Sequence, residues 1–583
     1  MKKRLVSIFL CVAMTAATVL SGCGASEDAD GTASKESGSN EKYKEFLTVD
    51  VFDTLANYQG IQSGWFGKIV KDKFNMELNI IAPNVAGGGD ALFQTRSAAG
   101  NLGDLVIVGT QNGRLNDLVK AGLLMDMTDL LKNKAVMKEY EDAITQTKQL
   151  TEQDGIYAIP SEISDNSPES VEDGIEPLVS PLVRWDAYKA AGCPEVKTLE
   201  DYIPAMKAMQ EQVPESDSGK KTYAISMFKD WDDGLMVGAK NYASLYGYLE
   251  SGFAMAKADG SDIQDVIADE GLYVRSLKFL FDANQEGLVD PESTTQNWDT
   301  LANKYRDGQV LTSHWSWQGK DCYNTAENKE AGKGFMPLMI DDMECFAYGC
   351  YAQGNTKNMI GIGSKAEDPE RMADFIDWLY SPEGMELYQA GPEGLTWEMK
   401  DDKAVRTDFG NKALNGEKVS VPEEWGGGEY TDGVSALNFK ALSVTNINPE
   451  NKEPYSRAMW SSELEKNNTP LDLDWQEYTG GAKTTVEFLE MNDALSVSAG
   501  TSYSQPEEPS DITTLRNQCK EVIKDSSWKM VFAKDEAEFK SVLKNMQDTV
   551  KGLGYDQVLE LDIQNAKDEA KAKVKAIEEY NNK

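Results

Sequence analysis

The hydrophobic pattern in the first part of the chain alternates between short apolar runs and helical stretches. Runs rich in Leu, Ile and Val lie at 46–51, 77–81 and 104–109, and such runs are typical of buried strands. The segments between them, at 65–75 and 91–99, are predicted to be helices. This β-α-β-α-β alternation predicts an α/β layer with a mostly parallel sheet.

A second helical pattern lies at 368–384. Its apolar residues recur at intervals of three, four and seven, which places them on one helix face: Met372, Phe375, Ile376 and Leu379. Ser381-Pro382 ends the pattern, because proline cannot continue a helix. The chain has 583 residues and is 40% hydrophobic, so it can bury a large core as one two-lobed unit or as several domains.

The stretch 308–317 joins a short strand to two tryptophans. Residues 310–312 form the apolar strand, and Trp315 and Trp317 follow it with one serine between them. On an extended backbone these two side chains share one face. Two aromatic planes beside hydroxyl groups suit the apolar face of a sugar. Core packing beneath a loop is the alternative, and the periodicity favours neither.

Several segments resemble the sugar-binding proteins of ABC importers, the maltose-binding-protein superfamily. Residues 305–308 together with Trp315 and Trp317 resemble that family's second crossing between two lobes, where the chain returns to the first lobe and an aromatic side chain stacks on sugar. Residues 154–160 resemble the first crossing. Residues 391–398 resemble the Gly-x-Glu-Gly segment of the family's large lipoprotein branch.

The resemblance implies a two-lobed, periplasmic-binding-protein-like fold of type II, in which each lobe is an α/β layer and a hinge joins the lobes. It covers about residues 46–565, with a less typical stretch at 400–477. We therefore expect the following divisions: a lipoprotein signal peptide at 1–22, a flexible tether at 23–45, a first lobe from 46–160 and 312–390, and a second lobe from 161–311 and 391–583.

The candidates for ligand contact are mainly tryptophans, whose planes suit sugar faces: Trp65, Trp231, Trp298, Trp315, Trp317, Trp397 and Trp425. Gln111 follows the strand at 104–109, at the carboxyl end where open α/β sheets bind ligands. Asp233 lies near Trp231, with helix capping as its alternative role. Glu162 matches a position that often reaches the ligand in the family, with a solvated loop carboxylate as the alternative.

The N-terminus has the features of a processed signal. Basic residues at 2–4 precede an apolar run at 5–20, and the segment Leu-Ser-Gly-Cys at 20–23 resembles the bacterial lipobox. The resemblance implies lipidation of Cys23, with palmitate among the fatty acids, and an anchor on the outer face of the cell membrane. A plain secretory signal or a membrane-spanning anchor is the alternative, although the run is short for a span.

The composition excludes several classes of function. The formal net charge is −39, and it becomes −42 when the three basic residues of the signal are removed. Such a surface repels nucleic acid and bare anionic membranes. The single histidine argues against zinc, and segment 214–221 has too few carboxylates for the calcium loop of many relatives. We therefore expect no metal and no cofactor.

Disulfide pairing stays open. Five cysteines lie outside the signal and the lipobox, so at least one thiol is unpaired. These are Cys193, Cys322, Cys345, Cys350 and Cys519. Cys345 and Cys350 are close enough in sequence to pair across a turn.

Together these observations predict a lipid-anchored, monomeric substrate-binding protein of an ABC importer. It would capture a neutral oligosaccharide between its lobes by hinge closure and, as the resemblance implies, deliver it to the permease subunits. A surface-anchored glycoside hydrolase is the alternative, with carboxylates such as Glu162, Asp233 and Glu398. The sequence has no G-x-S-x-G elbow, and a Ser-His-Asp triad would depend on His314 alone.

Overall fold

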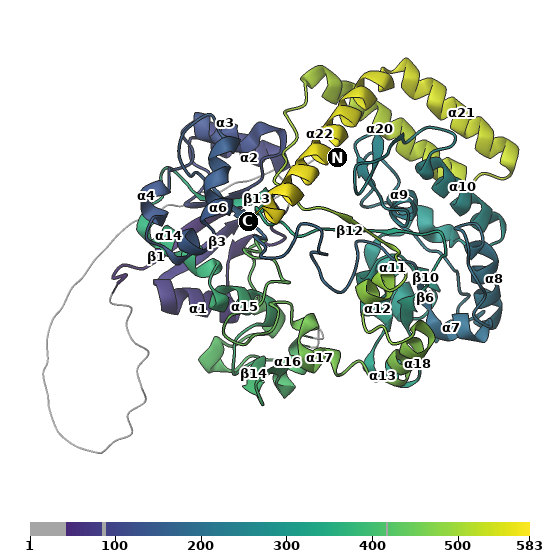
Figure 1. The fold of residues 1–583 in the computed structure, drawn as a ribbon, viewed down its shortest axis with the longest axis horizontal. Helices are drawn as coiled ribbons and strands as arrows, with labels where there is room; N and C mark the ends of the chain where they lie inside the picture. Colours follow the sequence, from purple (N-terminus) through teal and green to yellow (C-terminus); the bar gives the residue numbers. More distant parts are fainter. Residues whose placement is uncertain (1–41, 84, 86–88, 415–417, 583) are drawn as a thin grey trace, which may run out of the picture.

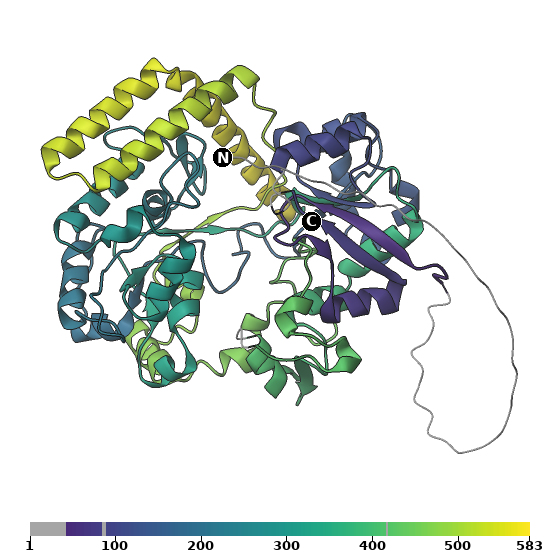
Figure 2. The ribbon, with the colours of Figure 1, turned by 180° about the vertical axis from the view of Figure 1, so that it is seen from behind.

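The computed structural model describes residues 42–83, 85, 89–414 and 418–582. The chain forms two lobes, and each lobe has its own sheet and its own large apolar core (Figures 1 and 2). The two-lobed α/β fold expected from the sequence is therefore confirmed. Because each lobe buries its own hydrophobic surface, the edges of the two sheets are held in fixed places.

Among the described residues, the first lobe is built on a six-stranded sheet. Its strands are β1 Leu47–Asp53, β2 Gly60–Ile61, β3 Met76–Ile81, β4 Leu105–Val108, β5 Ile159–Ser161 and β13 Asn355–Ile362. Their order is β2-β3-β1-β4-β13-β5. The strands β1, β3 and β4 are parallel and contain the predicted apolar runs, while β13 lies antiparallel between β4 and β5.

Helices cover this sheet and supply the first core. They include α1 Gly64–Phe74, α14 Pro369–Leu379 and α15 Pro382–Ala390. Phe74 of α1 meets Phe375 of α14 edge to face, with ring centroids 5.4 Å apart. The apolar stripe predicted at 368–384 is therefore the buried face of α14, and Ser381 caps the start of α15 by accepting a hydrogen bond from the N–H of Gly384 at 3.1 Å.

The second lobe contains a smaller sheet of β6 Leu182–Arg184, β10 Thr312–Ser313 and β11 Phe335–Pro337. Isolated bridges extend it, because Tyr223 pairs with Val310 and Ile225 pairs with Val289, both in parallel. The core beneath is closed by long helices: α10 Leu272–Gln285, α20 Ser510–Val531, α21 Glu536–Gly552 and α22 Tyr555–Asn581.

The two apolar cores assign some segments to a different lobe than the sequence predicts. Residues 312–345 belong to the second lobe, because β10 and β11 both pair with β6 and Met336 is buried in the second core. The expected return to the first lobe at 312 is therefore displaced to the end of β12 (Cys345–Tyr348). Residues 391–455, expected in the second lobe, contribute Leu395 and Tyr455 to the first core.

Several strands and one helix connect the lobes. β12 pairs in parallel with β16 (Leu495–Ser498), and Ile163 forms bridges to Tyr351 and Leu442. The C-terminal helix α22 runs from the second lobe to this junction (Figure 1). Near its end, the hydroxyl of Tyr580 donates to the carbonyl of Asp165 at 3.2 Å. The junction therefore holds segments from distant parts of the sequence.

The residues that the structure describes begin at 42, within the tether predicted at 23–45. Tyr43 is buried in the first core, and its hydroxyl donates to Asp374 on α14. The predicted signal peptide at 1–22 and the lipidation site Cys23 lie outside the described residues. Within the described residues, the helices are too polar or too short to cross a membrane.

Candidate functional site

The carboxyl edges of both sheets are turned toward the junction between the lobes. In the first lobe, β5 ends at Ser161 and continues directly into the junction segment. In the second lobe, that segment enters β6 at Leu182, and Leu182 is paired with Ser313, the last residue of β10. Ligands of open α/β sheets bind outside the carboxyl ends of the strands. These two edges therefore define the candidate site.

Four of the predicted tryptophans meet at the carboxyl edge of the second lobe. The ring centroids of Trp315 and Trp317 are 5.2 Å apart, and those of Trp298 and Trp317 are 4.8 Å apart. Trp231 lies 5.4 Å from Trp317 and 6.1 Å from Trp315. Phe228 joins the group, 5.0 Å from Trp231. We call these four tryptophans and Phe228 the aromatic cluster.

The aromatic cluster is assembled from three segments. Trp315 follows β10, and its N–H is held by the hydroxyl of Ser313 at 3.3 Å. Trp317 lies in the first turn of α12 (Ser316–Tyr323), and Trp298 begins α11 (Trp298–Arg306) beside it (Figure 1). The N–H of Trp298 donates to Asp230 at 3.2 Å, which ties α11 to the loop that carries Trp231.

Trp231 gives the aromatic cluster an open side. It is 49% exposed, whereas Trp298, Trp315 and Trp317 are half-buried. A half-exposed indole plane backed by three others is held rigidly and costs little entropy when it orders against a ligand. The arrangement is suited to stacking against the apolar face of a sugar ring.

His314 lies behind Trp315 and adds no charge to the cluster. Its ring is 4.9 Å from that of Trp315, and its Nε2 is 3.1 Å from Nδ2 of Asn241. Burial lowers the pKa of His314 to about 4, so the ring is neutral at ordinary pH. The only histidine of the chain therefore serves packing behind the aromatic surface.

Asp233 and Gln111 lie at the two edges but make other contacts. Asp233 is exposed and pairs with Lys520 on α20 at 2.7 Å. Its neighbour Asp232 accepts a hydrogen bond from Nε1 of Trp528 at 2.6 Å and fixes the loop. Gln111 is exposed at the carboxyl end of β4, where its Nε2 donates to the carbonyl of Lys357 at 2.9 Å.

Glu162 is engaged by neighbouring side chains at the junction. One carboxylate oxygen is 2.7 Å from Nζ of Lys440, and the other accepts from Nδ2 of Asn355 at 2.6 Å. Lys440 also contacts Glu172 at 2.8 Å, so one cation joins two carboxylates. Burial disfavours the charge on Lys440, but the two carboxylates raise its pKa above the ordinary value. Glu162 thus positions Lys440, and Lys440 is half-buried at the edge.

Sequence reasoning missed other residues at this edge of the first lobe. Asp53 ends β1, is fully buried, and accepts the N–H of Asn438 at 2.8 Å. Burial raises its pKa to about 6. Tyr388 on α15 is exposed close to the Glu162–Lys440 pair, which affects its pKa. Asp53 could have been found from the sequence, because it is an acidic residue that closely follows a predicted strand. No sequence pattern marks Tyr388 or Lys440 as residues of this edge.

The other three tryptophans do not join the aromatic cluster. Trp65 is 2% exposed and stacks on Tyr430, with centroids 5.5 Å apart, so its assignment to the ligand site is wrong. Trp397 is 6% exposed and donates to the carbonyl of Gly391 at 3.0 Å. Trp425 is half-buried against the first core. All three lie in the first lobe. Trp65 belongs to α1, and Trp397 and Trp425 lie beside α1 and α15.

The cysteines and acidic groups do not form a redox or metal site within the described part of the chain. All five cysteines at 193, 322, 345, 350 and 519 are free thiols. No group of three or more His, Cys, Asp or Glu side chains among the described residues is arranged to hold a metal ion. Asp307 instead accepts hydrogen bonds from Ser216 and Ser218 of segment 214–221, each at 2.8 Å.

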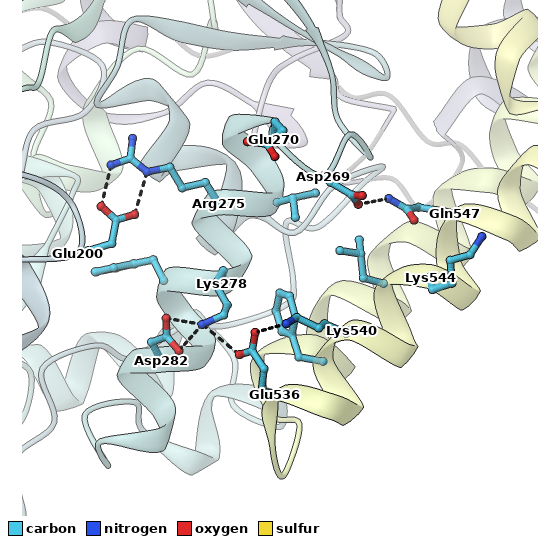
Figure 3. A pocket seen from close by; sticks show the side chains of 14 residues that line it. Glu200, Asp269, Glu270, Arg275, Lys278, Asp282, Glu536, Lys540, Lys544 and Gln547 are labelled. Carbon is cyan, nitrogen blue, oxygen red and sulfur yellow. Dashed lines mark hydrogen bonds and ion pairs between the residues drawn. The ribbon is translucent and has the colours of Figure 1, made fainter.

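A groove of about 570 Å³ lies between α10 and α21 on the second lobe (Figure 3), and its lining includes none of the candidate residues. Its charged rim is largely self-paired. Arg275 contacts Glu200 at 2.8 Å, and Lys278 contacts Asp282 at 2.7 Å and Glu536 at 3.2 Å. The Lys278–Glu536 pair joins α10 to α21, so we interpret the groove as a feature of helix packing.

Comparisons with known proteins agree with this architecture. A family model described as a bacterial extracellular solute-binding protein matches residues 72–394. Lipoprotein LipO of Bacillus subtilis (strain 168) is 20% identical over 420 residues, which are 68% of this chain and 75% of that protein.

Solved structures share the fold over nearly the whole chain. An HMO binding ABC-transporter associated solute binding protein from Bifidobacterium longum infantis is similar with a TM-score of 0.58 and 12% identity, over 91% of this chain and 99% of that one. The Streptococcus pneumoniae ABC-transporter substrate binding protein FusA, in complex with kestose, has a TM-score of 0.59 and 14% identity, over 89% and 98%.

Proposed function

The chain belongs to the bacterial extracellular solute-binding protein family, and we propose that it is the substrate-binding component of an ABC importer for a neutral oligosaccharide. Family membership places it among binding proteins rather than enzymes. The proposed ligand lies between the lobes, against the aromatic cluster of the second lobe and the edge of the first lobe that carries Lys440 and Tyr388.

The aromatic cluster is the observation that carries this proposal. Indole planes gathered at a strand end, with Trp231 open to solvent, match the flat apolar faces of sugar rings. Several planes in one cluster favour a ligand with more than one ring. His314 is neutral behind the cluster, and Lys440 is already paired with both Glu162 and Glu172, so neither side chain offers an unpaired positive charge to an anionic ligand.

The proteins with similar folds support the same class of ligand. One is named for HMO binding and another was solved with kestose. At 12% and 14% identity the shared feature is the fold, so the ligand class rests on the cluster of this chain.

We further propose that the protein is anchored through a lipid on Cys23, works as a monomer, and presents its closed form to the permease subunits on the outer face of the cell membrane. The lipobox-like segment at 20–23 and the similarity to a lipoprotein support the anchor. Closure of two lobes about a junction of connecting strands is the general way in which such folds signal occupancy.

A thermal-shift screen of residues 24–583 tests the ligand class. The panel contains kestose, milk oligosaccharides, maltodextrins and, as anionic controls, uronic-acid oligomers, and released sugars are assayed in the same wells. A ligand that binds the folded state raises the melting temperature by mass action. A shift with a neutral glycan and no product supports the proposal, whereas a shift only with uronic acids, or product formation, refutes it.

A further inference from the structure

A pocket of about 180 Å³ lies beside α22, the helix that runs from the second lobe to the junction (Figure 1). Its lining comes from α22, from the connecting strands β12 and β16, and from the hairpin of β7 (Tyr248–Ser251) and β8 (Ala254–Lys257). The lining includes no residue of the aromatic cluster. The volume is below the range of about 300–1,000 Å³ for drug-sized ligands, so the pocket suits a ligand of a few atoms.

Two lysines from different lobes line this pocket. Lys573 lies on α22, whose Tyr555 and Val558 pack in the second core, and Lys357 lies on β13 of the first-lobe sheet. Burial lowers the pKa of Lys573; the charge of Glu569 opposes this effect, and the charge of Lys357 adds to it. The two cations are therefore close enough to repel each other across the pocket.

The ammonium group of Lys573 makes only long contacts with the described residues. The side chain is 12% exposed, and its Nζ is 3.6 Å from Oε1 of Glu569 and 3.4 Å from the carbonyl oxygen of Ala258. Hydrogen bonds from N–H to oxygen are usually about 2.7–3.2 Å long. A buried charge is costly unless it is paired and hydrogen-bonded, and an ammonium group has three donors. Lys573 therefore has donors left for a negatively charged partner.

The carboxylates of the pocket do not balance both lysines. Glu569 and Glu250 line the pocket as well. Glu250 forms an ion pair with Lys240, which is not part of the lining. Glu569 is thus the carboxylate left to balance Lys573 and Lys357. Although the whole chain is acidic, the pocket keeps an excess of positive charge.

Three tyrosines add neutral donors to the lining: Tyr348, Tyr351 and Tyr503. Burial, together with the charges of Glu569 and Glu250, raises the pKa of Tyr348 to about 12, so its hydroxyl keeps its proton and can donate. Hydroxyl and ammonium groups both donate to the oxygens of an anion, and such charge-assisted hydrogen bonds are strong. The lining therefore has the donors that a small oxyanion needs.

We propose that this pocket binds a small oxyanion, of the phosphate or sulfate type, between Lys573 and Lys357. The anion replaces the repulsion between the two cations by charge-assisted hydrogen bonds to both of them. Because one lysine belongs to each lobe, the bound anion links α22 to β13 across the junction. The site is separate from the proposed sugar site, and the inference does not rest on the import function.

Calorimetric titration of the 24–583 protein with sodium phosphate and, separately, sodium sulfate tests the proposal, with sodium chloride holding the ionic strength constant. At least one of the two anions should bind with a dissociation constant of about 1 mM or below. Lys573→Met and Lys357→Met each remove one cation and keep a long side chain. Each should weaken this binding by about tenfold or more. Circular dichroism checks that both variants are folded.

Two controls separate this site from the general charge of the surface and from the aromatic cluster. Lys575→Met removes an exposed cation on α22 that does not line the pocket, and anion binding should be unchanged. Trp315→Ala should also leave it unchanged. If neither anion binds well above millimolar concentration, water fills the pocket and the proposal is overturned. Binding that survives in both Lys573→Met and Lys357→Met places the anion elsewhere and overturns the proposal as well.

Discussion

The indole rings of Trp315 and Trp317 stack with their centroids 5.2 Å apart and their planes 24° from parallel. Trp315 has extended backbone angles and precedes α12, whereas Trp317 belongs to the helix. The stack therefore bridges a strand end and a helix start, and Trp231 leans on both rings from a separate loop. A ligand that contacts any one of these planes depends on the others for its rigidity.

Trp315→Ala should weaken oligosaccharide binding more than tenfold while the fold survives, because it removes both a stacking plane and the support of Trp231. Calorimetry with the sugar found in the thermal-shift screen gives the change. Tyr478→Ala, an exposed aromatic on α18 (Pro470–Thr479) of the same lobe, is the matched control. Equal affinities of Trp315→Ala and the unchanged protein would remove the cluster from the ligand site.

The aromatic cluster shows how far sequence patterns reach. Trp315 and Trp317 were recognisable because they follow a strand, and Trp231 because it follows another strand with acidic residues. Trp65 is also a tryptophan, yet it lies on the buried face of α1 with Phe66 and Val70. The sequence alone does not show whether a tryptophan in a helix is buried, because that depends on which other segment of the chain packs over that face of the helix.

The crossing between the lobes was misplaced for a related reason. A strand followed by aromatics at 308–317 fits the end of a lobe, but β11 returns to the same sheet before the chain leaves. Residues 391–455 were unpredictable because they fold back on the first lobe through isolated contacts, such as the bond from the N–H of Asn438 to Asp53. Such long-range pairs leave no periodicity in the sequence.

Trp65→Ala should destabilise the protein by about 3–5 kcal/mol, the usual cost of removing a large buried aromatic. The stack on Tyr430 and the bond from Nε1 of Trp65 to the carbonyl of Tyr430 at 3.2 Å are lost together. Urea unfolding measures the loss. Trp65→Phe keeps most of the packing and should cost less, and sugar affinity of the folded fraction should not change. A change in affinity without a loss of stability would return Trp65 to the ligand site.

Cys23→Ala should release the full-length protein from the membrane, because the proposed lipid is attached to that thiol. Fractionation of cells into membrane and soluble material measures the distribution. Cys193→Ala, a free thiol of the second lobe, is the control and should stay in the membrane fraction. Continued membrane association of the Cys23 variant would refute the lipid anchor.

Glu386→Gln should change the pH dependence of stability. The pKa of Glu386 is raised to about 7 in the folded state, so the folded protein binds the proton more tightly than the unfolded chain. Its contribution is therefore favourable at acid pH and is lost as pH rises toward 7. The variant should gain up to about 3 kcal/mol relative to the unchanged protein between pH 4 and pH 8. Urea unfolding across this range tests it, with Glu398→Gln expected to show no such trend.

Lys440→Met tests whether the charge pairs at the junction hold the edge of the first lobe. The change leaves Glu162 and Glu172 facing each other without their cation, and removing one partner from a buried pair costs about 3–5 kcal/mol. The side chains retain some exposure, so the lower end of this range applies. Urea unfolding gives the loss, and sugar affinity should fall too because the junction edge is disturbed.

The triple variant Lys440→Met, Glu162→Gln, Glu172→Gln separates charge from packing. It keeps the side-chain shapes and removes the repulsion between the carboxylates, so it should recover most of the stability lost in Lys440→Met. If the triple variant is no more stable than Lys440→Met, the loss of stability comes from the shape of the methionine side chain and not from repulsion between the carboxylates. Recovery of stability without recovery of sugar affinity would show that at least one charge of this group, on Lys440, Glu162 or Glu172, contacts the ligand.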